Sequence, residues 1–152
     1  MLARVRLPRK AQYAICGVFD LAYNGQGEPV QIRAISARQA IPARYLEQIF
    51  QRLRRAGLVR SKRGPGGGYR LARAPEEISL REVVEAVEGP LRASPAAAGR
   101  RTANAYRPDF VWPALAAGFA DLLDATSLEG LCRDAARASV ERAAPPAPMY
   151  FI

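Results

Sequence analysis

Apolar residues recur every three or four positions over three stretches of the first half of the chain, a spacing typical of amphipathic helices. The first stretch follows Pro8 and ends at Asn24-Gly25. Its apolar positions are Ala11, Ala14, Ile15, Val18, Phe19 and Ala22. A brief second helix is predicted over residues 31–39, with two isoleucines on one face.

The third helix, predicted over residues 42–56, has the clearest division into an apolar and a polar face. Pro42 suits the first position of a helix, and Gly57 is a signal for its end. The apolar face is formed by Leu46, Ile49, Phe50 and Leu53. The polar face is formed by Arg44, Glu47, Gln48, Gln51, Arg52 and Arg55. Side chains of these types bind phosphates or reach the edges of bases, so this face predicts contact with nucleic acid.

A β-hairpin with a glycine-rich tip is predicted after the third helix. Two short strand patterns, at residues 58–62 and 69–72, flank the segment RGPGGG. These glycines are not a nucleotide-binding P-loop, because the pattern GxxxxGK[ST] is absent and the glycines join two strands. We therefore predict the wing of a winged helix. Glycines such as Gly66 allow a partner to approach closely, and Arg63 is placed to enter a narrow minor groove.

The second half of the chain is predicted to contain three further helices around a loop. The first covers residues 78–87 and begins with a capping box of Ser79 and Glu82. A second capping box at residues 126–129 opens the last helix, which runs to about Val140. The predicted units are a winged helix-turn-helix domain (1–90), a flexible loop (91–108), dimerisation helices (109–140) and a disordered tail (141–152).

The helix predicted over residues 109–124 has more apolar surface than the winged domain alone can cover. We therefore expect it to pair with a second copy of the chain, which also suits a two-fold symmetric DNA site. The alternative is that this helix folds back on its own domain. The residues expected at the dimer interface are Trp112, Leu115, Phe119, Leu122 and Leu123. The predicted fold class is mainly α with a small β-hairpin wing (α+β).

The positive charge of the chain lies in its first half. Of 152 residues, 23 are Lys or Arg and 14 are Asp or Glu, for a net charge of +9. Residues 1–75 hold 15 basic and 3 acidic residues, a net charge of +12, and the remainder holds 8 and 11, a net charge of −3. Such a division is typical of a nucleic-acid-binding module joined to a module of another kind.

The residue types that are absent exclude most catalytic chemistry. The chain has no histidine, and its two cysteines, Cys16 and Cys132, do not form a CxxC pair. A catalytic Ser-His-Asp or Cys-His arrangement and a histidine-containing zinc site are therefore impossible, and we predict that the protein is not an enzyme. The sequence has no apolar run of about 18 residues, and its first ten residues lack the apolar stretch of a signal peptide. We expect a cytoplasmic protein without membrane association.

The segment ISARQAIPARYLEQIFQRLRRAGLVRSKRGPGGGYRL resembles the winged helix-turn-helix of IscR-type regulators, within the wider Rrf family of bacterial transcription factors. The resemblance extends from about Tyr13 through VVEAVEG to TSLEGL, which is most of the chain. It implies a homodimer with a long dimerisation helix that binds double-stranded DNA at a pseudo-palindromic site.

The resemblance also implies roles for individual residues. Glu47 would read bases in the major groove, most simply by accepting a hydrogen bond from a cytosine amino group. Arg63 would insert into the minor groove, while Arg60 and Lys62 would touch phosphates. The candidate DNA-binding residues are Pro42, Arg44, Tyr45, Glu47, Gln48, Arg52, Arg60, Lys62, Arg63 and Gly66.

The segment before the dimerisation helix departs from the resemblance. IscR-like regulators hold a 2Fe-2S cluster there through three cysteines and usually a histidine. The corresponding residues of this chain are Ser94, Arg100, Tyr106 and Asp109, none of which offers a thiolate or an imidazole. We therefore expect no iron–sulfur cluster, no metal and no other cofactor. Control would come instead from a regulatory protein, a small-molecule effector or thiol oxidation.

Three other functions remain open from the sequence alone. A winged helix that no longer reads DNA would be an interaction module that controls a metabolic enzyme. A thiol or atypical-cluster redox sensor would use Cys16 or Cys132, although both are expected to be small core residues. An RNA-binding winged helix would use the same charge but would lack exposed aromatic side chains for base stacking. A steep dependence of binding on salt, with a large preference for one site, would favour specific DNA binding.

Overall fold

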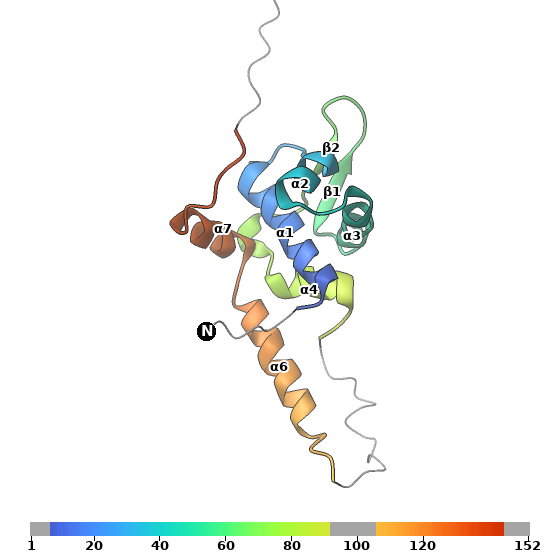
Figure 1. Cartoon of the computed structure of the whole chain (residues 1–152), viewed down its shortest axis with the longest axis vertical. Helices are drawn as coiled ribbons and strands as arrows, with labels where there is room; N and C mark the ends of the chain where they lie inside the picture. Colours follow the sequence, from blue (N-terminus) through green and yellow to red (C-terminus); the bar gives the residue numbers. More distant parts are fainter. Residues whose placement is uncertain (1–6, 92–105, 145–152) are drawn as a thin grey trace, which may run out of the picture.

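The computed structural model describes residues 7–91 and 106–144 of the chain (Figure 1). The predicted loop at residues 92–105 and the predicted tail at residues 145–152 lie outside the described residues. The elements are α1 (Arg9–Asn24), α2 (Ile32–Gln39), α3 (Ala43–Arg55), β1 (Val59–Lys62), β2 (Gly68–Leu71), the short 3₁₀ helix η1 (Pro75–Glu77), α4 (Leu80–Glu88), α6 (Val111–Asp124) and α7 (Leu128–Arg137). The predicted fold class is confirmed, and each predicted helix overlaps an observed one.

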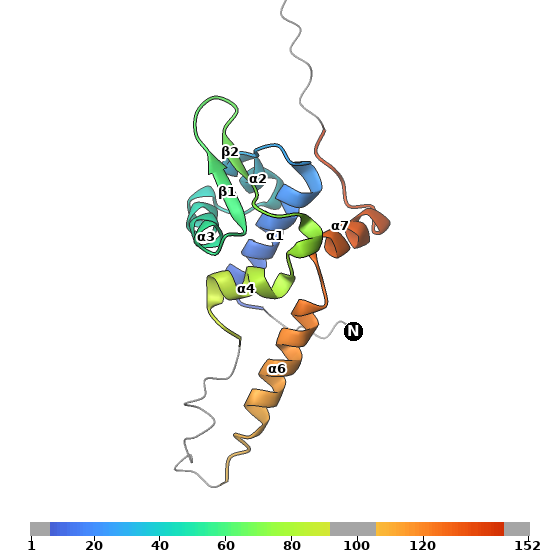
Figure 2. The ribbon, with the colours of Figure 1, turned by 180° about the vertical axis from the view of Figure 1, so that it is seen from behind.

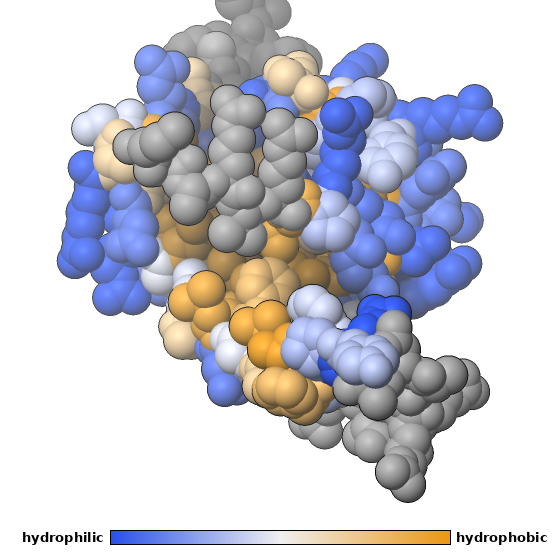
Figure 3. Space-filling view, turned by 60° about the horizontal axis from the view of Figure 1, so that its bottom comes forward, coloured by the Kyte–Doolittle hydropathy of each residue, from blue (hydrophilic) through white to orange (hydrophobic). Residues whose placement is uncertain are grey.

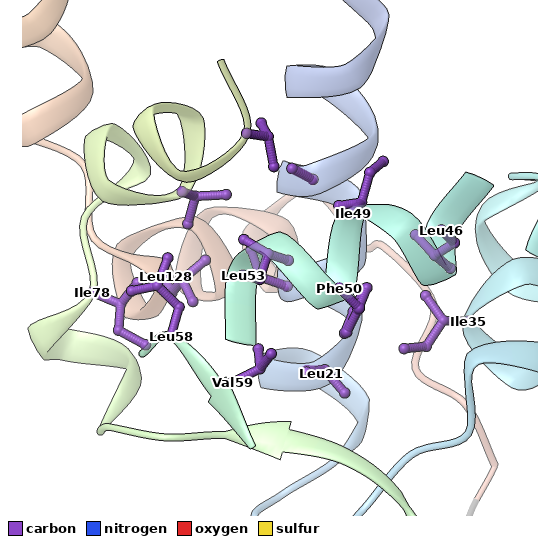
Figure 4. Packing of buried hydrophobic residues seen from close by; sticks show 14 of the residues in the cluster. Leu21, Ile35, Leu46, Ile49, Phe50, Leu53, Leu58, Val59, Ile78 and Leu128 are labelled. Atoms are coloured by element: carbon purple, nitrogen blue, oxygen red, sulfur yellow. The ribbon is translucent and has the colours of Figure 1, made fainter. Parts of the chain in front are cut away.

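Helix α1 runs through the centre of the fold, with α2, α3, α4 and α7 around it (Figures 1 and 2). Leu46, Phe50 and Leu53 of α3 are completely buried in the core against α1 (Figure 4). A Cβ atom on Gly17 of α1 would lie only 2.7 Å from Cε2 of Phe50. The glycine therefore allows the Phe50 ring to pack directly on the backbone of α1, which sets the distance between the two helices.

An ion pair with a buried carboxylate joins α1 to α2. Asp20 is completely buried, and Arg38 and Gln39 donate hydrogen bonds of 2.9 Å and 3.1 Å to its Oδ2 atom. Arg38 also donates to Oδ1, so that both carboxylate oxygens are satisfied. Because an unpaired buried carboxylate is costly, this pairing holds the end of α2 at a defined place on α1.

The turn between α2 and α3 depends on a residue in the left-handed conformation. Ala40 has a φ of 53°, which costs a residue with a Cβ atom about 1 kcal/mol. The Ser36 hydroxyl donates to the Ile41 carbonyl (2.6 Å), and the Ile41 amide donates to the Ser36 carbonyl (3.2 Å). These hydrogen bonds define the direction in which α3 leaves the turn.

Helix α3 ends in a Schellman motif that directs the chain into the wing. The amide of Gly57 donates to the carbonyl of Arg54, and the amide of Leu58 donates to that of Leu53, both at 3.0 Å. Gly57 has a φ of 76°, which glycine adopts without strain. Leu53 and Leu58 are both buried, so the apolar contact expected of this motif is also in place.

The predicted wing is an antiparallel hairpin of β1 and β2, in which Val59 is opposite Leu71 and Lys62 is opposite Gly68. The ring of Tyr69 meets the ring of Phe50 edge to face at 5.0 Å, which attaches the inner side of the wing to the core. The other edge of β2 pairs with Val30, whose backbone exchanges two hydrogen bonds of 2.8 Å with Tyr69. The wing is therefore held on both sides of β2.

The two predicted capping boxes have different outcomes. The first is confirmed, because Ser79 accepts from the amide of Glu82 (3.2 Å) and Glu82 accepts from the amide of Ser79 (3.1 Å). The second is wrong in register. Ser127 caps α7 by accepting from the amide of Gly130 (3.0 Å), and a glycine at that position has no side chain to return the bond. The corner before α7 is set instead by tertiary pairing, since Leu128 donates to the Ile78 carbonyl at 2.9 Å.

Helix α6 points away from the body of the molecule at the end opposite the wing (Figures 1 and 2). Its last two turns contact the body, where Leu123 is 7% exposed and packs with Ala11 and Val84. Trp112, Leu115 and Leu122 are 54%, 57% and 67% exposed. The helix thus folds back on its own domain only at its C-terminal end.

Part of the predicted tail is attached to the fold. Arg142 lies over the ring of Tyr23 at 4.1 Å and donates to the Tyr23 carbonyl (2.9 Å). The Ala143 amide donates to the side chain of Asn24 (2.8 Å). Residues 141–144, which we expected to be disordered, therefore lie on the C-terminal end of α1. The apolar and polar pattern of this stretch carries no sign of these contacts because most of them involve backbone atoms.

Candidate nucleic-acid interface

The outward face of α3 is a row of long polar side chains. Arg44, Gln48, Gln51 and Arg55 are spaced at intervals of four, three and four residues, so they lie on one side of the helix, opposite the buried stripe. All four are exposed. Arg44 and Gln48 belong to the predicted DNA-binding set. Gln51 and Arg55 were assigned only to the polar face, although their helical spacing from Arg44 places them in the same row.

Glu47 lies on the flank of α3 that faces the wing. It is exposed and is the only acidic residue of the helix. Arg54, two turns further along the same flank, donates to the Ser61 hydroxyl of β1 at 3.3 Å. Among the described residues Glu47 makes no ion pair, so its carboxylate remains able to accept a hydrogen bond from a base.

Tyr45 and Arg52 lie on the other flank of α3, where both contact the protein itself. The Tyr45 ring, 37% exposed as a residue, meets the ring of Tyr13 edge to face at 5.5 Å. Arg52 donates to the Val87 carbonyl in the last turn of α4 (3.2 Å). These contacts differ from the expectation that both side chains are simply available to DNA. Arg52 joins α3 to the C-terminal end of α4, where a cation is favourable.

The tip of the wing is a tight turn made of glycine and proline. The Gly67 amide donates to the Gly64 carbonyl (2.9 Å), and Gly66 has a φ of 71°. A Cβ atom added at Gly66 would meet nothing within 4 Å, so the tip has open space around it. Arg63 is exposed immediately before this turn, at the point where a minor groove would be reached.

The cations of α3 and the wing lack carboxylate partners in the part of the chain that the structure describes. Within residues 7–91 and 106–144, no carboxylate forms an ion pair with Arg44, Arg55, Arg60, Lys62 or Arg63. Arginines elsewhere in the fold do have acidic partners, such as Arg73 with Glu82 and Arg81 with Glu85. The surface formed by α3 and the wing therefore carries an excess of positive charge that suits a polyanion.

An exposed, arginine-rich helix presented beside a basic β-hairpin is the arrangement by which winged helix-turn-helix proteins bind DNA. The fold and this surface define the chain as a protein of that class. Pro42 is the N-cap residue of α3, one position before the first helical position that the sequence predicted for it, and it is exposed.

The profile of the Rrf2 family, described as iron-dependent transcriptional regulators, matches residues 7–134, so the chain belongs to this family. It is 49% identical over 84 residues to the HTH-type transcriptional regulator IscR of Aliivibrio salmonicida, covering 55% of this chain and 50% of that protein. It is 48% identical over 84 residues to IscR of Escherichia coli O1:K1 / APEC, covering 55% and 52%. The chain thus spans about half the length of the curated relatives it matches.

Two solved structures are similar over most of the chain. T. potens IscR superposes with a TM-score of 0.72 at 32% identity, over 92% of this chain and 95% of that one. CymR, the global cysteine regulator of B. subtilis, superposes with a TM-score of 0.70 at 29% identity, over 88% and 98%. These relatives are regulators rather than enzymes, which confirms the prediction that the chain is not an enzyme.

The residues before α6 do not fit an iron–sulfur cluster. Ser94 and Arg100 lie outside the described residues, and neither side chain is a cluster ligand. At the other two corresponding positions are a phenol, Tyr106, and Asp109. The Asp109 carboxylate accepts from the Trp112 indole (3.1 Å) and pairs with the Arg107 guanidinium (3.3 Å). This carboxylate is already bound by two donors of the protein itself, which does not suit an iron ligand.

Neither cysteine is set up as a reactive thiolate. Burial raises the pKa of Cys16, which is half-buried on α1. Burial, followed by the negative charge of Glu129, raises the pKa of Cys132 to about 11, against a smaller opposing effect of Arg142. At neutral pH both thiols are protonated, and the protonated form is a poor nucleophile and a poor metal ligand.

Within residues 7–91 and 106–144, no helix is long and apolar enough to cross a membrane.

Proposed function

We propose that the chain is a homodimeric transcriptional regulator that binds a specific, pseudo-palindromic DNA site and works without an iron–sulfur cluster. The observation that carries this proposal is the exposed row of arginine and glutamine side chains on α3 beside a wing whose cations have no acidic partner among the described residues. Such a surface lowers its free energy by releasing counterions from phosphates and by hydrogen bonding to base edges. Relatives of this chain bear the name of HTH-type transcriptional regulators, which supports the proposal.

In the bound state α3 lies in the major groove. Arg44, Gln48, Gln51 and Arg55 project directly from it toward bases and phosphates, and Glu47 accepts a hydrogen bond from a cytosine amino group. Arg63 enters the neighbouring minor groove at the glycine-rich tip. Arg60 and Lys62 contact phosphates on the way to that tip. Arg52 acts differently from the others, because it holds α3 against α4.

The dimer forms through the exposed apolar side of α6. Figure 3, which views the molecule from the α6 end, shows apolar side chains gathered on this face with polar side chains around them. Trp112, Leu115, Phe119 and Leu122 recur at intervals of three or four residues, which makes one stripe along the helix. Trp112, Leu115 and Leu122 face water, whereas Phe119 is half-buried against the body. An exposed apolar stripe of this kind is typical of a protein interface. Leu123 supports the interface from behind, because it is buried in its own chain.

Control of DNA binding passes to something other than a metal centre. Cys16 is half-buried, Cys132 is buried, and both thiols are protonated. A regulatory protein or a small-molecule effector is therefore the proposed signal. Iron and acid-labile sulfide assays after anaerobic reconstitution test this part of the proposal. Less than a tenth of a cluster per chain is expected, on the order of adventitious metal. A visible spectrum with about one cluster per chain would contradict it.

The experiment that tests DNA binding is a selection from random duplexes with the full chain, followed by titration of the selected site against a scrambled one. We expect a preference of at least about 1000-fold for the selected site and a steep loss of affinity with salt. A weak preference with a shallow salt slope would contradict specific DNA binding and would favour a protein-interaction module instead.

A further inference from the structure

The outer face of the wing holds two arginines directly opposite each other. In the register of the hairpin, Arg60 of β1 is the partner of Arg70 of β2, and both are exposed. The Cβ atoms of directly opposed residues in an antiparallel pair lie about 4.5–5.5 Å apart. Like charges at this separation repel each other and destabilise the hairpin. Lys62, two positions along β1 from Arg60, adds a third positive charge to the same face.

No described carboxylate relieves this repulsion by an ion pair. Glu28 lines the same surface hollow as Arg70 but makes no ion pair with it. The next arginine along the chain, in contrast, has bonding partners. Arg73 pairs with Glu82 and also donates to the Glu77 carbonyl. Arg73 thus has an acidic partner, whereas Arg60 and Arg70 have none among the described residues. Unrelieved repulsion between two like charges is a local conflict that is typical of a functional site.

The backbone of the pair is held in place from the opposite side. Tyr69, next to Arg70, packs on Phe50 and exchanges two backbone hydrogen bonds with Val30. The two guanidinium groups consequently project from a fixed strand pair and can converge on one group between them. A phosphate diester is suited to that position, since its two anionic oxygens accept from two planar guanidinium donors at once.

We propose that Arg60 and Arg70 together form a clamp for one phosphate of the DNA backbone. Arg70 is thereby added to the DNA interface, because only Arg60 of this pair was expected there. In the free protein the pair weakens the wing by repulsion, and the bound phosphate removes that cost, so DNA binding itself stabilises the hairpin. The clamp rests on the proposed function, because its ligand is nucleic acid.

The test compares R60Q, R70Q and the double variant with the wild-type chain in two measurements. Thermal unfolding of the free protein reads the repulsion without DNA. At low salt each single variant should raise Tm by about 1–3 °C, and the double variant should raise it no further, because either change removes the repulsion. The gain should shrink at high salt as the charges are screened.

The second measurement is DNA affinity as a function of salt on the selected and the scrambled duplex. The slope of log K against log salt is negative, and in the double variant it should become shallower by about 0.9, equally on both duplexes. This corresponds to about 3.5-fold less loss of affinity between 50 and 200 mM salt. R73Q is the matched control. It should lower Tm, because Arg73 has acidic and carbonyl partners, and should leave the slope unchanged.

The outcomes separate the clamp from the proposed function. A steep slope that is the same in the wild type and in the double variant overturns the clamp and leaves DNA binding intact. A wild-type chain without salt-dependent DNA binding overturns both. Millimolar inorganic phosphate at matched ionic strength checks for a free anion. A rise of Tm that only the wild type shows, together with an unchanged DNA slope, would assign the pair to a small anion and overturn the clamp.

Discussion

Glu47 stands alone as an acid on a helix that carries four arginines. A carboxylate repels phosphate, so at this position it lowers the affinity for DNA in general. It accepts hydrogen bonds only, and in the major groove the cytosine amino group is a donor that suits it. At the scale of the residue, the proposed function implies that Glu47 would make wrong sequences unfavourable, whereas the arginines around it would supply affinity.

The substitution Glu47→Ala should relax discrimination at one base position by about 1–3 kcal/mol while the affinity for the best site changes little. The measurement is a repeated duplex selection followed by titration of single-base variants. Glu28→Ala, which removes an exposed acid far from α3 in sequence, is the control and should leave the preference unchanged. A uniform loss of affinity on every sequence after Glu47→Ala would contradict base reading.

Arg52 and Arg55 are neighbours on α3 with different expected roles. Arg52→Ala should lower the free energy of unfolding by about 1 kcal/mol, because the hydrogen bond to the Val87 carbonyl is lost, and should leave the salt slope of DNA binding unchanged. Arg55→Ala should leave stability unchanged and reduce the slope by about one. Urea unfolding and salt titration separate the two. If Arg52→Ala reduced the slope and not the stability, our assignment of Arg52 would be wrong.

At the scale of the element, the turn between α2 and α3 decides how the recognition helix is presented. Ala40 adopts a left-handed conformation that glycine adopts without strain. The chain tolerates the strain because Ser36 and Ile41 exchange two hydrogen bonds across the turn. An alanine here also has fewer conformations in the unfolded chain than a glycine, which offsets part of the cost.

Ala40→Gly should therefore raise the free energy of unfolding by up to about 1 kcal/mol without changing DNA affinity. Ala37→Gly, the same replacement inside α2, is the matched control and should lower it by about 1 kcal/mol. Both values come from urea unfolding at equal ionic strength. Equal destabilisation by the two variants would show that the left-handed conformation at residue 40 carries no strain in solution.

At the scale of the whole molecule, α6 is the helix that leaves several large apolar side chains exposed to solvent in a single copy of the chain. Replacing Leu115, Phe119 and Leu122 together by Ala should convert the proposed dimer to a monomer and reduce the preference for a two-half-site duplex over a single half-site. Sedimentation at several protein concentrations measures the first effect. Leu123→Ala is the contrasting variant, since it removes a buried side chain and should cost about 2–4 kcal/mol of stability. A triple variant that remains dimeric would refute this interface.

Much of the fold follows from local sequence patterns. The stripe of Leu46, Phe50 and Leu53 predicts both the existence of α3 and its polar outer face, because helical geometry relates the two. The capping box of Ser79 and Glu82 is equally local and is confirmed. The exposure of Arg44, Glu47 and Gln48 was predictable to the same degree, since it follows from the buried stripe alone. Their binding to DNA stays a prediction.

The sequence by itself determined the helices, the hairpin, the basic face and the absence of cluster ligands, because each depends on neighbouring residues or on residue type. Only the tertiary structure decided which side chains of the polar and apolar faces contact the protein itself and which remain exposed. It turned Arg52 toward α4, buried Leu123 and placed Arg70 opposite Arg60. Those outcomes depend on contacts between segments far apart in the chain or on the register of a hairpin. A one-residue shift in the register of β1 and β2 would have removed the arginine pair.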